Sequence, residues 1–184
     1  MTQFEYLAIA FSLLYSLAAL RIIGGLSSAL SREVRSASHL ILTGTTLFLV
    51  AMSFWVFYSL AEVEWSFVGF LVALLIPGTL YYCAATVVPS DAEAVASWED
   101  HYLATRRRWF LGLAVWGASA AASASVNLGM GLAHPARGVQ ATAVTVGLVG
   151  AWTENAKVHR AIGVLFVAFT LVAIVAQLQS SWLA

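Results

Sequence analysis

The sequence predicts an all-α, polytopic membrane protein built as a bundle of six transmembrane helices. Of the 184 residues, 61% are hydrophobic and only 10% are charged, whereas soluble proteins carry about 25% charged residues. Several apolar runs reach the roughly 20 residues that match the hydrocarbon thickness of a bilayer. Helices satisfy their own backbone groups in lipid, and the short alternating strands of a membrane barrel are not apparent in the sequence.

The spans follow from these apolar runs in chain order. The predicted spans are Phe4–Leu26, His39–Leu60, Trp65–Val88, Trp109–Leu132, Gly138–Trp152 and Ala161–Gln179. The fifth is short and carries Gln140, Thr142 and Thr145, so a re-entrant segment is the alternative there. The start, MTQFEYLA, lacks the basic region of a cleavable signal peptide, and we therefore expect the first span to be retained.

Basic residues predict the orientation, because cytoplasmic loops are enriched in Lys and Arg. Most basic residues lie in or beside the first, third and fifth connections between the predicted spans, which face the same side of the membrane. They are Arg21, Arg32, Arg35, Arg106, Arg107, Arg108, Lys157 and Arg160. Only Arg137 falls on the other side. This distribution predicts an inner-membrane protein with both termini on the non-cytoplasmic side, and it supports the short fifth span.

The connection 89–108 is the one long connection, and it separates a first half, 1–88, from a second half, 109–184. Ser90 followed by Glu93 has the form of a capping box, which predicts a helix start. A mostly apolar stripe then recurs at helical spacing, through Val95, Trp98, Tyr102, Thr105 and Trp109. We expect an amphipathic helix at the inner membrane surface, or an extension of the fourth span. The two three-helix halves are candidates for an inverted repeat within one membrane domain.

The fourth span is rich in small residues, and spacing by four places residues on one helix face. One row consists of Gly117, Ala121, Ser125 and Gly129. The opposite row consists of Ser119, Ser123 and Asn127. The first row predicts close helix–helix packing and a central position. For the second row two readings stay open: hydrogen bonding between helices, or the wall of a polar pathway or pocket.

The third span contains LLIPGTLYYC, in which Pro77 cannot donate a backbone hydrogen bond. This predicts a kink near the middle of the span. Tyr81 and Tyr82 follow it and could supply hydroxyl groups to a pocket. Packing of a bent helix is the competing, structural interpretation.

Few ionisable residues fall inside the predicted spans. Arg21 is expected at the inner interface, with Glu154 as one candidate partner, and Arg106, Arg107 and Arg108 are expected to anchor the topology or to bind anionic headgroups. No cofactor is expected, and haem or a metal held by His39, His101 and His159 is the alternative. A pI near 6.9 offers no basic surface for nucleic acid.

Four segments, FEYLAIAFSLLYSLAALRIIGGL, FWVFYSL, LLIPGTLYYCAATVVP and HYLATRRRWF, carry a resemblance over nearly the whole chain. They are similar to an uncharacterised family of small six-helix bacterial inner-membrane proteins. The resemblance implies that location and architecture, and it implies no activity or site residues.

Two functions are compatible with this sequence. The first is passage of a small solute or ion, as a channel or transporter, along the row Ser119–Ser123–Asn127 and the kink at Pro77, in a homo-oligomer. The alternative is a non-transporting accessory subunit of a membrane complex that binds lipid or pigment. Membrane lipids are expected partners in both. An enzyme is not expected, because no nucleophile has a recognisable flanking motif.

Overall fold

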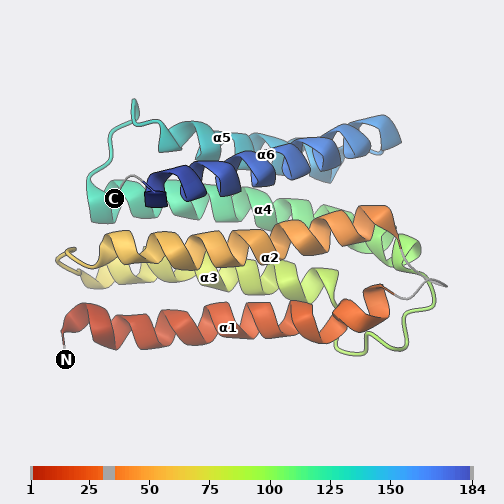
Figure 1. Ribbon diagram of the computed structural model, residues 1–184, viewed down its shortest axis with the longest axis horizontal. Helices are drawn as coiled ribbons and strands as arrows, with labels where there is room; N and C mark the ends of the chain where they lie inside the picture. Colours follow the sequence, from red (N-terminus) through yellow and green to blue (C-terminus); the bar gives the residue numbers. More distant parts are fainter. Residues whose placement is uncertain (1, 31–35, 183–184) are drawn as a thin grey trace.

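The structure is a computed structural model that describes residues 2–30 and 36–182, with side chains described except at 156 and 173–182. Over these residues the chain is all-α, as predicted, and forms an antiparallel bundle (Figure 1). The helices are α1 (Gln3–Ala29), α2 (Ala37–Phe57), the short 3-10 helix η1 (Tyr58–Leu60), α3 (Phe67–Val87), α4 (Trp98–Leu128), α5 (Ala136–Trp152) and α6 (Ala156–Trp182).

The first residues of the helices explain where several of them begin. Thr2 and Glu5 form a capping box at the start of α1. The hydroxyls of Ser36, Ser66 and Ser97 accept backbone hydrogen bonds at the starts of α2, α3 and α4. Such caps satisfy amide groups that have no partner inside the helix.

Four helices of the described chain are long and apolar enough to cross a membrane, which is compatible with an integral membrane protein. They are Gln3–Ala29, Ala37–Leu60, Phe67–Val87 and Trp98–Leu128. Helices also cover the predicted fifth and sixth spans, as α5 and α6. Membrane crossing by all six, and the inverted relationship of the two halves, stay predictions.

The start of α4 differs from the prediction that a helix begins at Ser90. Residues 88–97 are irregular, and Asp91 accepts a hydrogen bond from the amide of Ala94. The cap is Ser97, whose hydroxyl accepts from the amide of Asp100. The helix then continues without a break through Arg106–Arg108 to Leu128. The segment from Trp98 to Arg108 is therefore an extension of the fourth helix, the second of the two expected arrangements.

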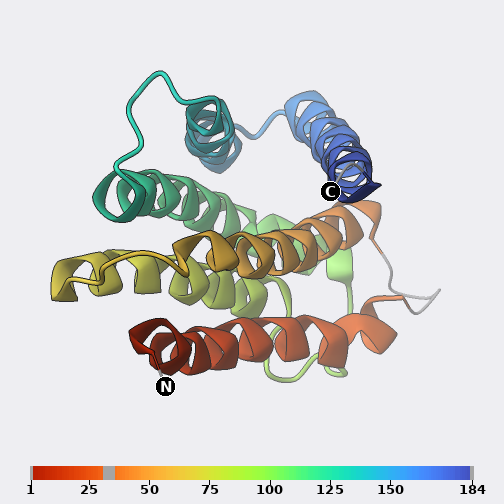
Figure 2. The same ribbon diagram turned by 60° about the vertical axis from the view of Figure 1, so that its left-hand side comes forward.

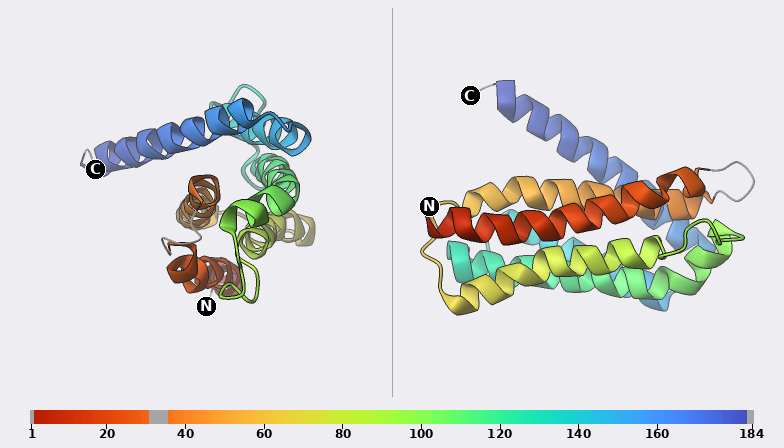
Figure 3. Two further views of the ribbon diagram at one scale, coloured as in Figure 1. Left: turned by 90° about the vertical axis from the view of Figure 1, so that its right-hand side faces the viewer. Right: turned by 90° about the horizontal axis from the view of Figure 1, so that it is seen from below.

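Helix α4 lies in the interior of the bundle, packed between α3 and α5. Figures 1 and 2 show α1 at one edge, with α5 and α6 together at the opposite edge. Figure 3 shows α6 crossing the bundle obliquely, and α2 and α5 are its main neighbours. Two cavities lie between α6 and the helices that it crosses.

Small residues allow α4 and α5 to approach closely. A Cβ atom on Gly147 would lie 2.7 Å from the backbone nitrogen of Ala114 and from the carbonyl oxygen of Phe110. A Cβ atom on Gly117 would lie 2.9 Å from the Cβ of Ala143. The two backbones therefore touch at positions where only glycine fits, which is the packing that small residues permit in membrane helices.

The antiparallel order brings the C-terminal ends of α1, α3 and α5 together with the starts of α2, α4 and α6. We call this the arginine-rich end, because its described basic residues are Arg21, Arg106, Arg107, Arg108, Lys157 and Arg160. Arg32 and Arg35 lie outside the described residues. Arg137 lies at the opposite end, at the start of α5.

Candidate functional site

The first turns of α4 place three polar side chains on one helix face at the arginine-rich end. Glu99, Tyr102 and Arg106 are three and four residues apart, the spacing at which side chains on a helix are neighbours. The Ser97 cap and the acidic residues of the first turn stabilise this helix start. The sequence alone therefore determines that these three groups share a face.

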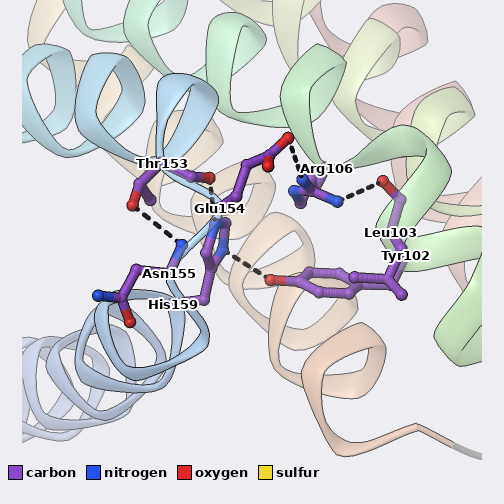
Figure 4. Close-up of polar contacts among 7 residues, drawn as sticks. All are labelled: Tyr102, Leu103, Arg106, Thr153, Glu154, Asn155 and His159. Atoms are coloured by element: carbon purple, nitrogen blue, oxygen red, sulfur yellow. Dashed lines mark hydrogen bonds and ion pairs between the residues drawn. The ribbon is translucent and has the colours of Figure 1, made fainter.

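The connection between α5 and α6, together with the start of α6, supplies the facing side chains (Figure 4). The hydroxyl of Tyr102 lies 2.8 Å from Nδ1 of His159, and Nε2 of His159 lies 3.0 Å from the carbonyl oxygen of Thr153. A carbonyl only accepts, so Nε2 of His159 carries the hydrogen and Nδ1 accepts from the Tyr102 hydroxyl. This chain of bonds fixes the start of α6 against α4.

Arg106 lies beside this pair. Its Nη1 donates to the carbonyl oxygen of Leu103 at 2.9 Å, and its Nη2 lies 3.7 Å from Oε1 of Glu154 (Figure 4). The Arg106 side chain is 21% exposed and that of Glu154 is 90% exposed. An ion pair this long and this exposed is weak, so the guanidinium retains donors for another group.

These residues stand at the charged end of a cleft of about 890 Å³ between α2, α4 and α6. The charged residues that line it are Glu99, Arg106, Glu154 and Arg160. Most of the remaining wall is apolar, and it includes Ile41, Leu42, Phe110, Ile162, Phe166 and Val167. The cleft thus joins a charged end to an apolar interior.

A second cavity, of about 440 Å³, lies beneath α6. Phe166 lines both cavities, and the second is enclosed by apolar residues of α2, α4, α5 and α6 such as Phe48, Leu113, Trp116 and Val146. The ring of Phe166 also packs edge-on against Trp109, at 5.8 Å between centroids. The apolar space under α6 therefore extends well beyond the charged end.

The polar row of α4 is bonded within the bundle. Asn127 donates from Nδ2 to the carbonyl oxygen of Gly69 on α3 at 3.1 Å and to the hydroxyl of Ser123 at 3.0 Å. Ser119 donates to the carbonyl oxygen of Val115 in its own helix. Ser119 and Ser123 are both buried. Ser123 also lines a mainly apolar cavity of about 300 Å³. Asn127 thus bonds to a neighbouring helix, whereas the hydrogen bonds of Ser119 and Ser123 stay within α4.

The small-residue row of α4 faces α5. Gly117 packs on Ala143, and Arg137 of α5 donates hydrogen bonds to the carbonyl oxygen of Ala121 and to the hydroxyl of Ser125. Gly129 ends the helix with φ of 60°, a left-handed conformation that glycine adopts without strain.

Pro77 is fully buried within α3, which continues as a helix through that position. Tyr81 and Tyr82 are 41% and 47% exposed. The Tyr82 ring lies beside Gly112 of α4. The structure thus buries Pro77 inside the bundle and places Tyr81 and Tyr82 at the surface of α3, and none of the three lines the cleft.

The interface charges find partners other than those expected. Arg21 donates from Nε to the carbonyl oxygen of Val88 at 2.9 Å, at the end of α3. Glu154, the candidate partner of Arg21, lies beside Arg106 instead. Helix carbonyls at a C-terminal end are natural acceptors for an arginine. The guanidinium of Arg107 lies 5.7 Å from the centre of the Trp152 ring, and Arg108 is exposed.

The three histidines at the arginine-rich end have different partners. Nε2 of His39 lies 3.0 Å from the carbonyl oxygen of Val87, and Nε2 of His101 lies 3.1 Å from the same oxygen. His159 bonds to Tyr102 and Thr153 instead. Within residues 2–30 and 36–182, no group of three His, Cys, Asp or Glu side chains is placed to hold one metal ion.

Sequence reasoning identified Arg106 and Glu154 as interface charges but missed the cleft that they line. It also missed Tyr102, Glu99 and Arg160 as parts of one site. The spacing of Glu99, Tyr102 and Arg106 was a usable signal, whereas the approach of α6 to that face depends on tertiary packing. A comparison with protein-family models, with curated proteins and with solved structures found no match to this chain.

Proposed function

We propose that this integral membrane protein binds a membrane lipid in the cleft between α2, α4 and α6. The headgroup contacts the charged end, and an acyl chain lies along the apolar wall toward Phe166. The observation that carries the proposal is the combination, in one cleft of about 890 Å³, of four charged residues at one end and an apolar interior. Ligand sites of roughly 300–1,000 Å³ with few polar groups are typical of small-molecule binding.

The length of α4 supports this assignment. The helix has 31 residues, which is about 46 Å at 1.5 Å per residue, against a hydrocarbon core of about 30 Å. If α4 crosses the core with the turns that end at Leu128, its first turns project into the headgroup layer. Glu99, Tyr102 and Arg106 then lie at headgroup level, and Phe110 lies just inside the hydrocarbon.

An apolar cleft that opens toward lipid is suited to an acyl chain, because water gains no hydrogen bonds there. Arg106 lies where a lipid phosphate would sit, and arginine is well matched to phosphate oxygens. Of the two functions that the sequence suggested, these contacts support the lipid-binding one. The bonds of Ser119 and Asn127 within the bundle lend no support to a solute path along that row.

The proposal is tested by a substitution that fills the apolar part of the cleft with a larger side chain. Val167 lines the cleft and is 48% exposed. We expect Val167→Trp to lose a co-purified phospholipid that the unaltered protein retains in native mass spectrometry. Val172→Trp is the matched control, because Val172 is also exposed on α6 and does not line the cleft. Equal lipid retention by Val167→Trp and the unaltered protein would remove the cleft as the binding site.

A further inference from the structure

We propose that the cleft selects a zwitterionic phospholipid whose headgroup carries a phosphate and a primary ammonium, as in phosphatidylethanolamine. This inference rests on the proposed function, and it specifies the chemistry of the ligand. Two opposite pairs of charges line the charged end: Arg106 and Arg160, and Glu99 and Glu154. Their formal charges cancel, so the site matches a headgroup that carries one charge of each sign.

The basic pair has donors available for a phosphate. Arg106 uses Nη1 for the carbonyl oxygen of Leu103, and its Nη2 lies 3.7 Å from Glu154, longer than a hydrogen bond. Arg160 is exposed, and its side chain has no hydrogen bond or ion pair within the described part of the chain. Guanidinium groups bind phosphate through paired, charge-assisted hydrogen bonds.

The acidic pair has acceptors available for an ammonium. Glu99 accepts a hydrogen bond from the Ser36 hydroxyl through Oε2, which leaves Oε1 for another donor. The Glu154 side chain is 90% exposed, with Arg106 as its weak partner. An ionised carboxylate accepts several hydrogen bonds, and a primary ammonium offers three donors.

The same geometry disfavours other common headgroups. A glycerol or other uncharged group beside the phosphate leaves Glu99 and Glu154 facing a net negative ligand. A choline group has no N–H to donate and is typically held by an aromatic cage. Tyr102 is the aromatic residue on the first turns of α4 that lines the cleft, and its hydroxyl is already bonded to His159.

The experiment compares four lipids with identical acyl chains, carrying ethanolamine, choline, glycerol or no group on the phosphate. Each competes for the purified protein in detergent, and native mass spectrometry counts the bound lipid. We expect the ethanolamine lipid to be preferred about tenfold over the choline and glycerol lipids, the effect of one well-made charged hydrogen bond.

Variants assign that preference to the acidic pair. Glu99→Gln with Glu154→Gln should abolish the preference for the ethanolamine over the glycerol lipid while lipid is still bound. Asp91→Asn is the matched control, since Asp91 is exposed, acidic and outside the cleft lining, and it should keep the preference.

The possible failures are distinguishable. Equal binding of all four lipids by the unaltered protein, or a preference for the glycerol lipid, overturns the headgroup inference and leaves lipid binding intact. An ethanolamine preference that survives the double Glu→Gln change also overturns it. Retention of no lipid by any form overturns the proposed function and this inference together.

Discussion

Asn127 of α4 and Gly69 of α3 are joined by a hydrogen bond of 3.1 Å between the side-chain amide and the backbone carbonyl. The contact links the end of α4 to the first turn of α3, 58 residues apart in the chain. An amide group in an apolar span thereby finds a partner on a neighbouring helix, so that its main contribution is to hold the two helices together.

Replacing Asn127 with alanine removes this bond and the bond to Ser123. We expect the free energy of unfolding to fall by about 1 kcal/mol, the usual scale for a hydrogen bond between membrane helices. Denaturant titration in detergent micelles measures it. Thr142→Ala is the control, because the Thr142 hydroxyl bonds to Gly138 in its own helix; an equal loss in both variants would contradict the assigned role.

Replacing Gly147 with alanine forces α4 and α5 apart. The added Cβ would lie 2.7 Å from backbone atoms of Phe110 and Ala114, which cannot turn aside as a side chain can. We expect a loss of about 1–3 kcal/mol in unfolding free energy, as for other overpacked sites. Gly44→Ala is the control, since its Cβ would meet nothing within 4 Å. That change should be neutral or stabilising by up to about 1 kcal/mol.

The guanidinium group of Arg137 connects the end of α4 to the start of α5 through several hydrogen bonds. Its hydrogen-bond acceptors are on Ala121, Ser125, Met130, Gly131 and Gln140. A lysine carries a compact ammonium group and cannot reproduce the several coplanar N–H donors of a guanidinium. We therefore expect Arg137→Lys to raise amide hydrogen exchange over residues 129–135. The exposed Arg108, changed to Lys, should leave exchange there unaltered, and a rise in that control would mean that the effect is not local.

His39 and His101 share one acceptor, the carbonyl oxygen of Val87. Either histidine alone still donates a hydrogen bond to this carbonyl. Losing one of the two bonds in a single change to phenylalanine should therefore lower the free energy of unfolding only slightly. The double change leaves the carbonyl without a side-chain donor. We expect the double variant to be less stable than the sum of the singles by about 1 kcal/mol.

A double-mutant cycle of unfolding free energies measures this coupling. The pair His39→Phe and His134→Phe is the control, because His134 is exposed and its Nδ1 accepts from Ala136 in its own loop. That pair should be additive. Additivity in the His39 and His101 pair would show that the shared carbonyl does not couple them.

Local features of the sequence were enough to predict most helices. Apolar runs such as Phe4–Leu26 and Trp65–Val88 correspond closely to α1 and α3, because a run of apolar residues and its caps act within a few turns. The error at Ser90 has the same origin. Ser90 with Glu93 and Ser97 with Asp100 are both plausible local starts, and the chain uses the second.

The candidate site was only partly predictable. Spacing alone places Glu99, Tyr102 and Arg106 on one face of a helix. The partners of that face, Glu154 and His159, are 48 and 57 residues away from Arg106 and Tyr102. Sequence spacing does not state how α6 is rotated or how obliquely it crosses the bundle.

By itself, the sequence determined that the chain is all-α and that several of its helices are long and apolar enough to cross a membrane, since apolar runs and helix caps act on each segment separately. Only the tertiary structure decided that Asn127 of α4 bonds to α3 and that a cleft opens beneath α6. Both depend on how helices distant in the chain pack side by side, which is settled by the fit of many side chains at once.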